Sequence, residues 1–290
     1  MSEIYFSGSE VTTEEEPKRF GKKIQHILTG IFLLFFLLFG ISFFQKGKLP
    51  AYSEIHPALL FEPEQIDRER NEFSFEYRGK TYYVKPWADY GITALVMSRN
   101  NISSLADSYH KSDSVDIRDL CVTWGNNLVN ESYQHVKVWN TSWMCYWQYE
   151  QEYGFQSSSI ANNHLIASDP HIREQILSIR PGDQVHLQGM LVDYGMAPNE
   201  YIRETSLSRT DTDDNARGGG ACEVFYVNGI EILSRSTPKW YFLFWLSEQG
   251  MIWSILLKIS LFLLRLFREK KRSDHLLEIH EKKQEEMENS

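Results

Sequence analysis

An uncharged stretch from Ile24 to Phe44 constrains this 290-residue chain more than any other feature. Basic residues come directly before it: Lys18, Arg19, Lys22 and Lys23. About 20 helical residues, each rising about 1.5 Å, cross the ~30 Å hydrocarbon core of a bilayer, and the basic cluster favours the cytoplasm for the N-terminal side. The stretch therefore predicts a transmembrane helix, residues 24–44, after a short cytoplasmic tail, residues 1–23.

A cleaved secretory signal also combines basic residues with an apolar stretch. Its apolar region usually spans only about 7–15 residues and ends at a small-residue cleavage site. Here the stretch is longer, and Phe43 and Phe44 stand where small residues would be needed. An uncleaved anchor is therefore the favoured interpretation.

A second apolar stretch, residues 240–267, leaves two interpretations open. Lys258 within it costs about 2.5–3.5 kcal/mol in a bilayer, but each Leu, Ile or Phe contributes about 0.3–0.6 kcal/mol in favour of insertion. A second transmembrane helix would end at the basic cluster 268–272 and return the C-terminus to the cytoplasm. The alternative is an interfacial helix lying in the membrane plane, with Ser254, Lys258 and Arg265 on its polar face.

Residues 268–290 are rich in Glu and Lys and are predicted to form a charged helical cytoplasmic tail. Leu276, Leu277 and His280 form a small stripe on it that would suit a partner.

Residues 45–238 have the composition of a folded domain outside the cytoplasm. With 42% hydrophobic and 14% aromatic residues, the chain has ample material for a core. A net charge of -9, with no basic cluster inside the domain, argues against a nucleic-acid partner. The expected partners are the membrane and either another protein or a second copy of the chain.

The domain reads mostly as strands. Residues 73–77 alternate apolar and polar side chains, and Arg78-Gly79-Lys80 predicts a turn into a second strand at 82–84. Further strands are expected at 92–97 and 120–124, and a long aromatic one at 135–148.

One helix is predicted in this region. Asp169 suits the N-cap, Pro170 the first position, and isoleucines recur at helical spacing up to Ile179. A long strand is expected at 185–194, where Gly189 permits a bulge.

A final hairpin is expected between 201–209 and 223–233. We therefore expect a transmembrane helix plus a mainly β (α+β) domain, a small barrel or sandwich that is OB-like or SH3-like, with one or two helices and a second, C-terminal hydrophobic helix.

All three cysteines, Cys121, Cys145 and Cys222, lie between the apolar stretches. Outside the cytoplasm a disulfide is expected, and three cysteines allow three pairings with one left over. Cys145–Cys222 is favoured because Cys222 follows the flexible 218–220, where a crosslink would fix the end of a long loop. Three buried thiols are the alternative. No local base in the sequence favours a catalytic thiol.

Three short segments carry side chains suited to chemistry, and the first of them resembles a calcium loop. Asp211, Asp213 and Asn215 match the first, third and fifth positions of an EF-hand. Ala216 stands where Gly is needed, and Cys222 where a bidentate Glu is needed. A solvated acidic loop is therefore favoured, and no metal or other cofactor is predicted.

The second segment is Asn162-Asn163-His164, which we expect in a loop before the helix. A His between polar residues can act as a base, but no second metal ligand stands at the required spacing. Asp183 and Asp193 are the carboxylates expected to assist His164 if it acts in catalysis.

The third segment, 119–127, places Asp119, Trp124 and three further polar or small residues around Cys121. A strand followed by an Asn-rich turn accounts for it without chemistry.

Four motifs, DLCVTWG at 119–125, NNHLI at 162–166, GDQV at 182–185 and GACE at 220–223, together resemble a family of uncharacterised bacterial envelope proteins with an N-terminal anchor. The resemblance covers about residues 49–233. It implies a periplasmic domain on the bacterial inner membrane, and it brings no known activity and no catalytic residues.

Two function classes follow. The favoured one is a non-enzymatic inner-membrane protein whose periplasmic β domain binds a partner or assembles in an envelope complex. The other is a membrane-anchored envelope enzyme, hydrolase-like, using His164 with Asp183 or Asp193.

Overall fold

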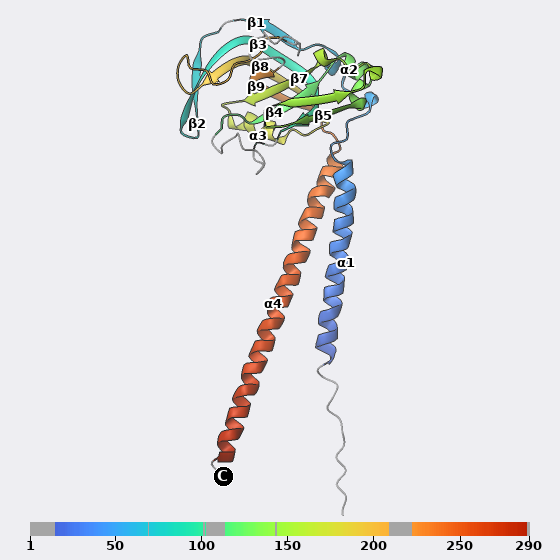
Figure 1. The fold of residues 1–290 in the computed structure, drawn as a ribbon, viewed down its shortest axis with the longest axis vertical. Helices are drawn as coiled ribbons and strands as arrows, with labels where there is room; N and C mark the ends of the chain where they lie inside the picture. Colours follow the sequence, from blue (N-terminus) through green and yellow to red (C-terminus); the bar gives the residue numbers. More distant parts are fainter. Residues whose placement is uncertain are drawn as a thin grey trace, which may run out of the picture. The chain divides into compact units, whose positions relative to one another are not determined.

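The computed structural model describes residues 15–68, 70–100, 102, 114–142, 144–208 and 222–288. The chain divides into two compact units. One holds the N-terminal helix up to Lys46 and the C-terminal helix from Lys239 onward, and the other is the β domain, Gly47–Pro238 (Figure 1).

The β domain is built on a closed, mixed five-stranded barrel (Figure 1). In spatial order its strands are β3 (Lys80–Arg99), β4 (Arg118–Thr123), β7 (Ile160–Ile166), β9 (Cys222–Ser234) and β8 (Gln184–Gly195). Strand β8 pairs again with β3 and so closes the barrel, and β7 and β9 are parallel. Of the expected barrel or sandwich, the chain forms the barrel.

Further elements surround the barrel. Strands β1 (Glu64–Asp67) and β2 (Phe73–Tyr77) pair with β3, and β5 (Val136–Asn140) pairs only with β6 (Cys145–Tyr149). The helices of the domain are the short α2 (Asn126–Val129) and α3 (Pro170–Ser178). Single 3-10 turns lie at Tyr52–Glu54, Pro57–Leu60, Ser132–His135, Gln151–Tyr153 and Ser157–Ser159.

Alternating side chains of the strands fill the barrel. On β3, residues Ala88, Tyr90, Ile92 and Ala94 point inward, and the Tyr90 ring packs at 5.0 Å against Phe225. Strand periodicity places every second residue on this face. The core therefore lies inside the barrel, and the intervening residues of each strand face outward.

Several local predictions are confirmed. The helix begins after Asp169, whose carboxylate accepts hydrogen bonds from the backbone N–H groups of His171 and Ile172, and Pro170 takes the first position. The strand pairing of β8 shifts between Gln188 and Gly189. A side chain at Gly189 would collide with the backbone carbonyl of Tyr226, so the strand needs glycine where it bends.

Three strand predictions are wrong. The strands expected separately at 82–84 and 92–97 are parts of one long strand, β3. The expected strand at 135–148 is a hairpin, because the chain turns between Asn140 and Cys145. The expected final hairpin lacks its first arm: residues 201–208 form no strand, and β9 pairs instead with β7 and β8.

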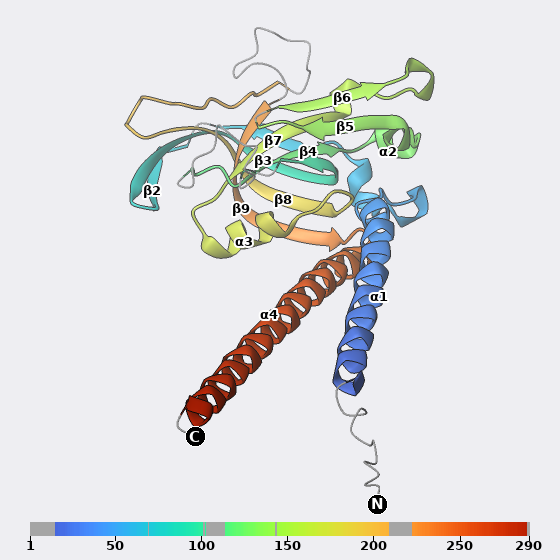
Figure 2. The same cartoon turned by 60° about the horizontal axis from the view of Figure 1, so that its bottom comes forward.

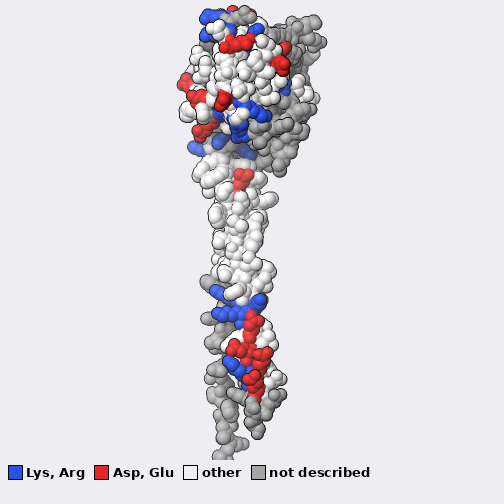
Figure 3. All heavy atoms as spheres, turned by 90° about the vertical axis from the view of Figure 1, so that its left-hand side faces the viewer, with Lys and Arg blue, Asp and Glu red and all other residues white. Residues whose placement is uncertain are grey.

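Two helices, α1 (Glu15–Gln45) and α4 (Pro238–Glu288), are long and apolar enough to cross a membrane. Only 11% of the apolar window of α1 and 6% of that of α4 is buried, unlike the core helix of a soluble domain. Figure 3 shows an uncharged band along them that ends at a cluster of Lys and Arg side chains.

The two helices pack together in antiparallel fashion. The rings of Phe39 and Phe244 lie 4.8 Å apart, and Gly250 lies so close to Phe35 that an added Cβ would overlap that ring. Small residues let membrane helices approach closely, which accounts for glycine at this point. Farther along α4, Lys258 Nζ donates a hydrogen bond of 2.8 Å to a hydroxyl on α1.

Candidate functional site

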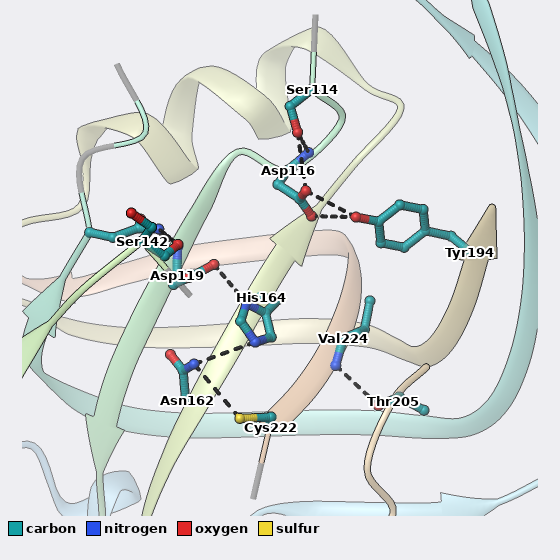
Figure 4. A network of polar contacts seen from close by, with 11 residues as sticks. Ser114, Asp116, Asp119, Ser142, Asn162, His164, Tyr194, Thr205, Cys222 and Val224 are labelled. Carbon is teal, nitrogen blue, oxygen red and sulfur yellow. Dashed lines mark hydrogen bonds and ion pairs between the residues drawn. The ribbon is translucent and has the colours of Figure 1, made fainter. Parts of the chain in front are cut away.

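His164 lies on a buried strand of the barrel and not in the expected loop. It is the fifth residue of β7, directly opposite Asp119 on β4, and both side chains point to the outer face of the barrel. The Nδ1 atom of His164 is 2.8 Å from Asp119 Oδ1, and both residues are buried (Figure 4). The histidine is therefore paired with a carboxylate that the sequence analysis placed in a different segment.

This pairing sets the charge of the imidazole. Burial alone would lower the pKa of His164, but the charge and hydrogen bond of Asp119, together with contributions from Cys222, raise that pKa to about 10. His164 is therefore an imidazolium at neutral pH. An imidazolium donates from both ring nitrogens, so Nε2 carries a proton on the side away from Asp119.

Asn162 and Cys222 lie beside this pair. Asn162 is opposite Cys121 on β4 and opposite Cys222 on β9, so these three residues form a row across adjacent strands. The Asn162 amide nitrogen is 3.4 Å from His164 Nε2 and 3.9 Å from Cys222 Sγ (Figure 4). We call Asp119, Asn162, His164 and Cys222 the polar cluster.

The disulfide differs from the expected one. Cys121 is bonded to Cys145, with their Cα atoms 5.8 Å apart, and Cys222 is a free thiol that is partly exposed. The prediction of a Cys145–Cys222 bridge is therefore wrong. Cys121 and Cys222 are separated by one strand, or about 9.6 Å at two strand spacings, which exceeds the span of a disulfide.

Asp183 lies away from the polar cluster and stabilises the fold. It is fully buried in the turn before β8, where its carboxylate accepts hydrogen bonds from the side chain of Arg235 and the backbone N–H of Ser236, both at 2.9 Å. Ser236 Oγ in turn donates to the carbonyl of Lys48. Asp183 thus fastens the last residues of the β domain beside its first residues.

Asp193, near the end of β8, is also fully buried. Its carboxylate accepts hydrogen bonds from Trp87 Nε1 at 2.8 Å and from the backbone N–H of Thr205 at 2.9 Å. Among the described residues, the carboxylate that bonds to His164 is that of Asp119. Neither Asp183 nor Asp193 is brought to it.

The three residues that match the calcium loop, Asp211, Asp213 and Asn215, lie outside the described residues. In the described part of the chain, no group of three or more His, Cys, Asp or Glu side chains is arranged to hold a metal ion.

A groove of about 480 Å³ lies on the outer face of β1, β3 and β8. Arg70 crosses it and donates a hydrogen bond of 2.7 Å to Asp89, which lowers the pKa of that carboxyl. His186, on the same face, lies 2.8 Å from the hydroxyl of Thr93. Arg70 and Asp89 bond to each other, His186 and Thr93 form a second pair, and the groove is open to water.

The β5–β6 hairpin presents an aromatic surface to solvent. Trp139 and Tyr146 stack with their rings 5.6 Å apart, and they are 38% and 42% exposed. Lys137 lies over the Trp139 ring, and the neighbouring Met144 is 44% exposed. Figure 2 shows this hairpin beside the barrel. We call these four residues the hairpin surface.

No protein-family model, curated protein or solved structure matches the chain. The resemblance of the four motifs to an envelope family therefore stays a prediction. Residues of three of those motifs meet in the polar cluster, which strand alternation in 119–123 and 160–166 would have indicated.

Proposed function

We propose that the chain is a bacterial inner-membrane protein whose two helices span the bilayer, with both termini in the cytoplasm, and whose periplasmic β domain binds a protein partner in an envelope assembly. The observation that carries this proposal is the hairpin surface. The place of the hairpin on the barrel and the arrangement of the helices also support the proposal.

The contacts of α4 favour a span over a helix lying in the membrane plane. An in-plane helix turns its polar stripe to water. Here Ser254 is 3% exposed, and Lys258 bonds to Thr29 of α1. Ser254 is therefore buried and Lys258 contacts the other helix, as the small and polar residues of paired transmembrane helices do.

The strand order supports an OB-type barrel. OB folds are five-stranded Greek-key barrels that bind their ligands mainly on the face of the second and third strands. In this barrel those strands are β4 and β7. The inner side of the hairpin covers part of their outer face, through Val136, Val138 and Trp147, and the disulfide from Cys121 to Cys145 ties it there. A partner would then contact the hairpin itself.

The chemistry of the hairpin surface suits a protein. Aromatic residues and Met are enriched at the centres of protein interfaces, and stacked rings lose little conformational entropy on binding. Lys137 contributes only one charge beside them. The overall acidity of the chain argues against nucleic acid, and contiguous exposed apolar side chains are typical of interaction sites.

The enzyme alternative built on His164 with Asp183 or Asp193 lacks support from the geometry. Those carboxylates hold Arg235, Ser236, Trp87 and Thr205 in place.

A photo-crosslinking experiment in native membranes tests the proposal. A photoreactive phenylalanine analogue replaces Tyr146 in the full chain, and the same analogue at Phe61, which is 72% exposed elsewhere on the domain, is the matched control. We expect a discrete crosslinked protein, or a crosslinked second copy, from position 146 and not from position 61. Equal products from both positions, or none from position 146, would contradict a binding role for the hairpin.

A further inference from the structure

The free thiol of Cys222 lies beside Asn162 and close to the paired His164 and Asp119. Cys222 is directly beside Asn162 in the parallel β7–β9 pair, and His164 is the next residue of β7 on the same face. Diagonal neighbours in a sheet are within reach of a long side chain such as histidine. Figure 4 shows dashed contacts from the Asn162 amide nitrogen both to the His164 ring and to the Cys222 sulfur.

Asp119, His164 and Cys222 follow one another as carboxylate, histidine and thiol, the order that activates a cysteine nucleophile. Asp119 holds Nδ1 of His164 at 2.8 Å, which leaves Nε2 directed toward the side where Asn162 and Cys222 lie. A carboxylate that orients a histidine, and a histidine that activates a thiol, form the Cys-His-Asp arrangement that recurs on unrelated folds. The amide of Asn162 donates to the Cys222 sulfur itself at 3.9 Å and so holds the thiol beside this pair.

The pairing of the other two cysteines favours acyl transfer over thiol–disulfide exchange at Cys222. Thiol–disulfide exchange within one chain needs a second thiol to resolve the mixed disulfide. The chain has three cysteines, and the other two are bonded to each other. Acyl transfer needs a single thiol, which Cys222 provides.

We propose that Cys222 is an acyl-accepting nucleophile for ester or thioester substrates, with His164 as its acid–base partner and Asp119 as a positioning residue. This inference is independent of the partner-binding function proposed above. The Cys222 sulfur attacks the acyl carbon, an S–C bond forms, and the bond from carbon to the leaving group breaks. His164 Nε2 gives its proton to the leaving group and takes up the proton that leaves the sulfur. Water then hydrolyses the thioester, releasing the free acid and returning a proton to the sulfur.

Acylation by p-nitrophenyl acetate tests this on the full chain in detergent, under non-reducing conditions. We expect a burst of one p-nitrophenol per chain and an acetyl group on the Cys222 peptide by mass spectrometry. Cys222→Ser abolishes the burst. His164→Gln slows it about 100-fold, in the range of an acid–base contribution. Asp119→Asn slows it less, and Asp119→Glu recovers part of the rate.

Two controls separate catalysis from ordinary reactivity and from folding. His186→Gln removes a strand histidine outside the polar cluster and leaves the burst unchanged, and urea-unfolded wild type reacts as slowly as a free thiol. Wild type that shows no burst, or acetylates Cys222 no faster folded than unfolded, overturns the proposal whichever variants fold. An unchanged burst in folded His164→Gln overturns it as well, because a histidine that only stabilises the fold would leave the rate of acylation unaltered.

Discussion

The backbone N–H of Gly47 donates a hydrogen bond of 3.1 Å to the hydroxyl of Thr237, so the first and last residues of the β domain lie side by side. Ser236 reinforces this contact through the carbonyl of Lys48, and Asp183 holds Ser236. A domain joined to helices at both ends thus has its two connections fixed at one point.

Asp183→Ala is expected to destabilise the domain. The substitution removes the carboxylate that accepts from the part-buried N–H of Arg180 and the buried N–H of Ser236, and it leaves Arg235 without this ion pair. Because Arg235 is 37% exposed and can turn to water, we expect a loss of about 2–4 kcal/mol, below the upper range for a buried pair. Urea unfolding in detergent, followed by Trp fluorescence, measures it. Asp67→Ala, at an exposed strand position, should change stability by less than about 0.5 kcal/mol.

The stability of the domain should fall between about pH 7 and 10. The pKa of His164 is raised from 6.5 to about 10 in the folded chain. The stability that His164 contributes is therefore complete below pH 6.5 and is lost as the pH rises through about 10. The groups that face it are Asp119 and Cys222. Unfolding free energies measured near pH 7 and near pH 10 should differ more for wild type than for His164→Gln. An equal pH dependence in the two proteins would show that His164 is neutral when folded.

Removing the disulfide should loosen the β5–β6 hairpin. Cys121 and Cys145 are 24 residues apart, and closing a loop of that size stabilises a protein by about 3 kcal/mol in the chain-entropy model. In Cys145→Ser we expect faster hydrogen exchange in residues 136–149 and a lower unfolding midpoint. Cys222→Ser, which breaks no crosslink, is the matched control. A non-reducing peptide map that links Cys222 to either other cysteine would refute the pairing itself.

Gly250→Leu should separate the two helices. Its side chain would occupy the position of the Phe35 ring, whereas Gly30 on α1 has no atom within 4 Å of a built Cβ. With cysteines at positions 39 and 244 in a Cys222→Ser background, a short bismaleimide should link the helices efficiently. We expect Gly250→Leu to reduce the crosslinked fraction and Gly30→Leu to leave it unchanged. Equal crosslinking in both would mean that the helices do not pack at Gly250.

Local chemistry in the sequence predicted much of the fold. The Asp169-Pro170 pair marked the start of α3, and Gly189 marked the bend of β8. The alternation in 73–77 and the turn at Arg78-Gly79 predicted the pairing of β2 with β3. In each case the determining contacts lie within a few residues, so a sequence pattern contains them.

The polar cluster was not predicted from the sequence, because its contacts join distant parts of the chain. Polar residues at Asn162, Asn163 and His164 read as a loop, because a strand buried on both faces is rarely so polar. They form a strand because their backbones pair with β4 and β9, and Asp119 pairs with His164. Likewise, no spacing rule distinguishes Cys121 from Cys222 as the partner of Cys145. Strand register decides it.

The two-span arrangement is tested most directly by topology reporters in a bacterial host. Alkaline phosphatase is fused after Glu150, an exposed position in the β domain, and separately after Asp274, beyond the basic cluster of α4. The account predicts an active enzyme after Glu150, in the periplasm, and an inactive one after Asp274, in the cytoplasm. Activity after Asp274 would contradict a second span, and inactivity after Glu150 would contradict a periplasmic domain.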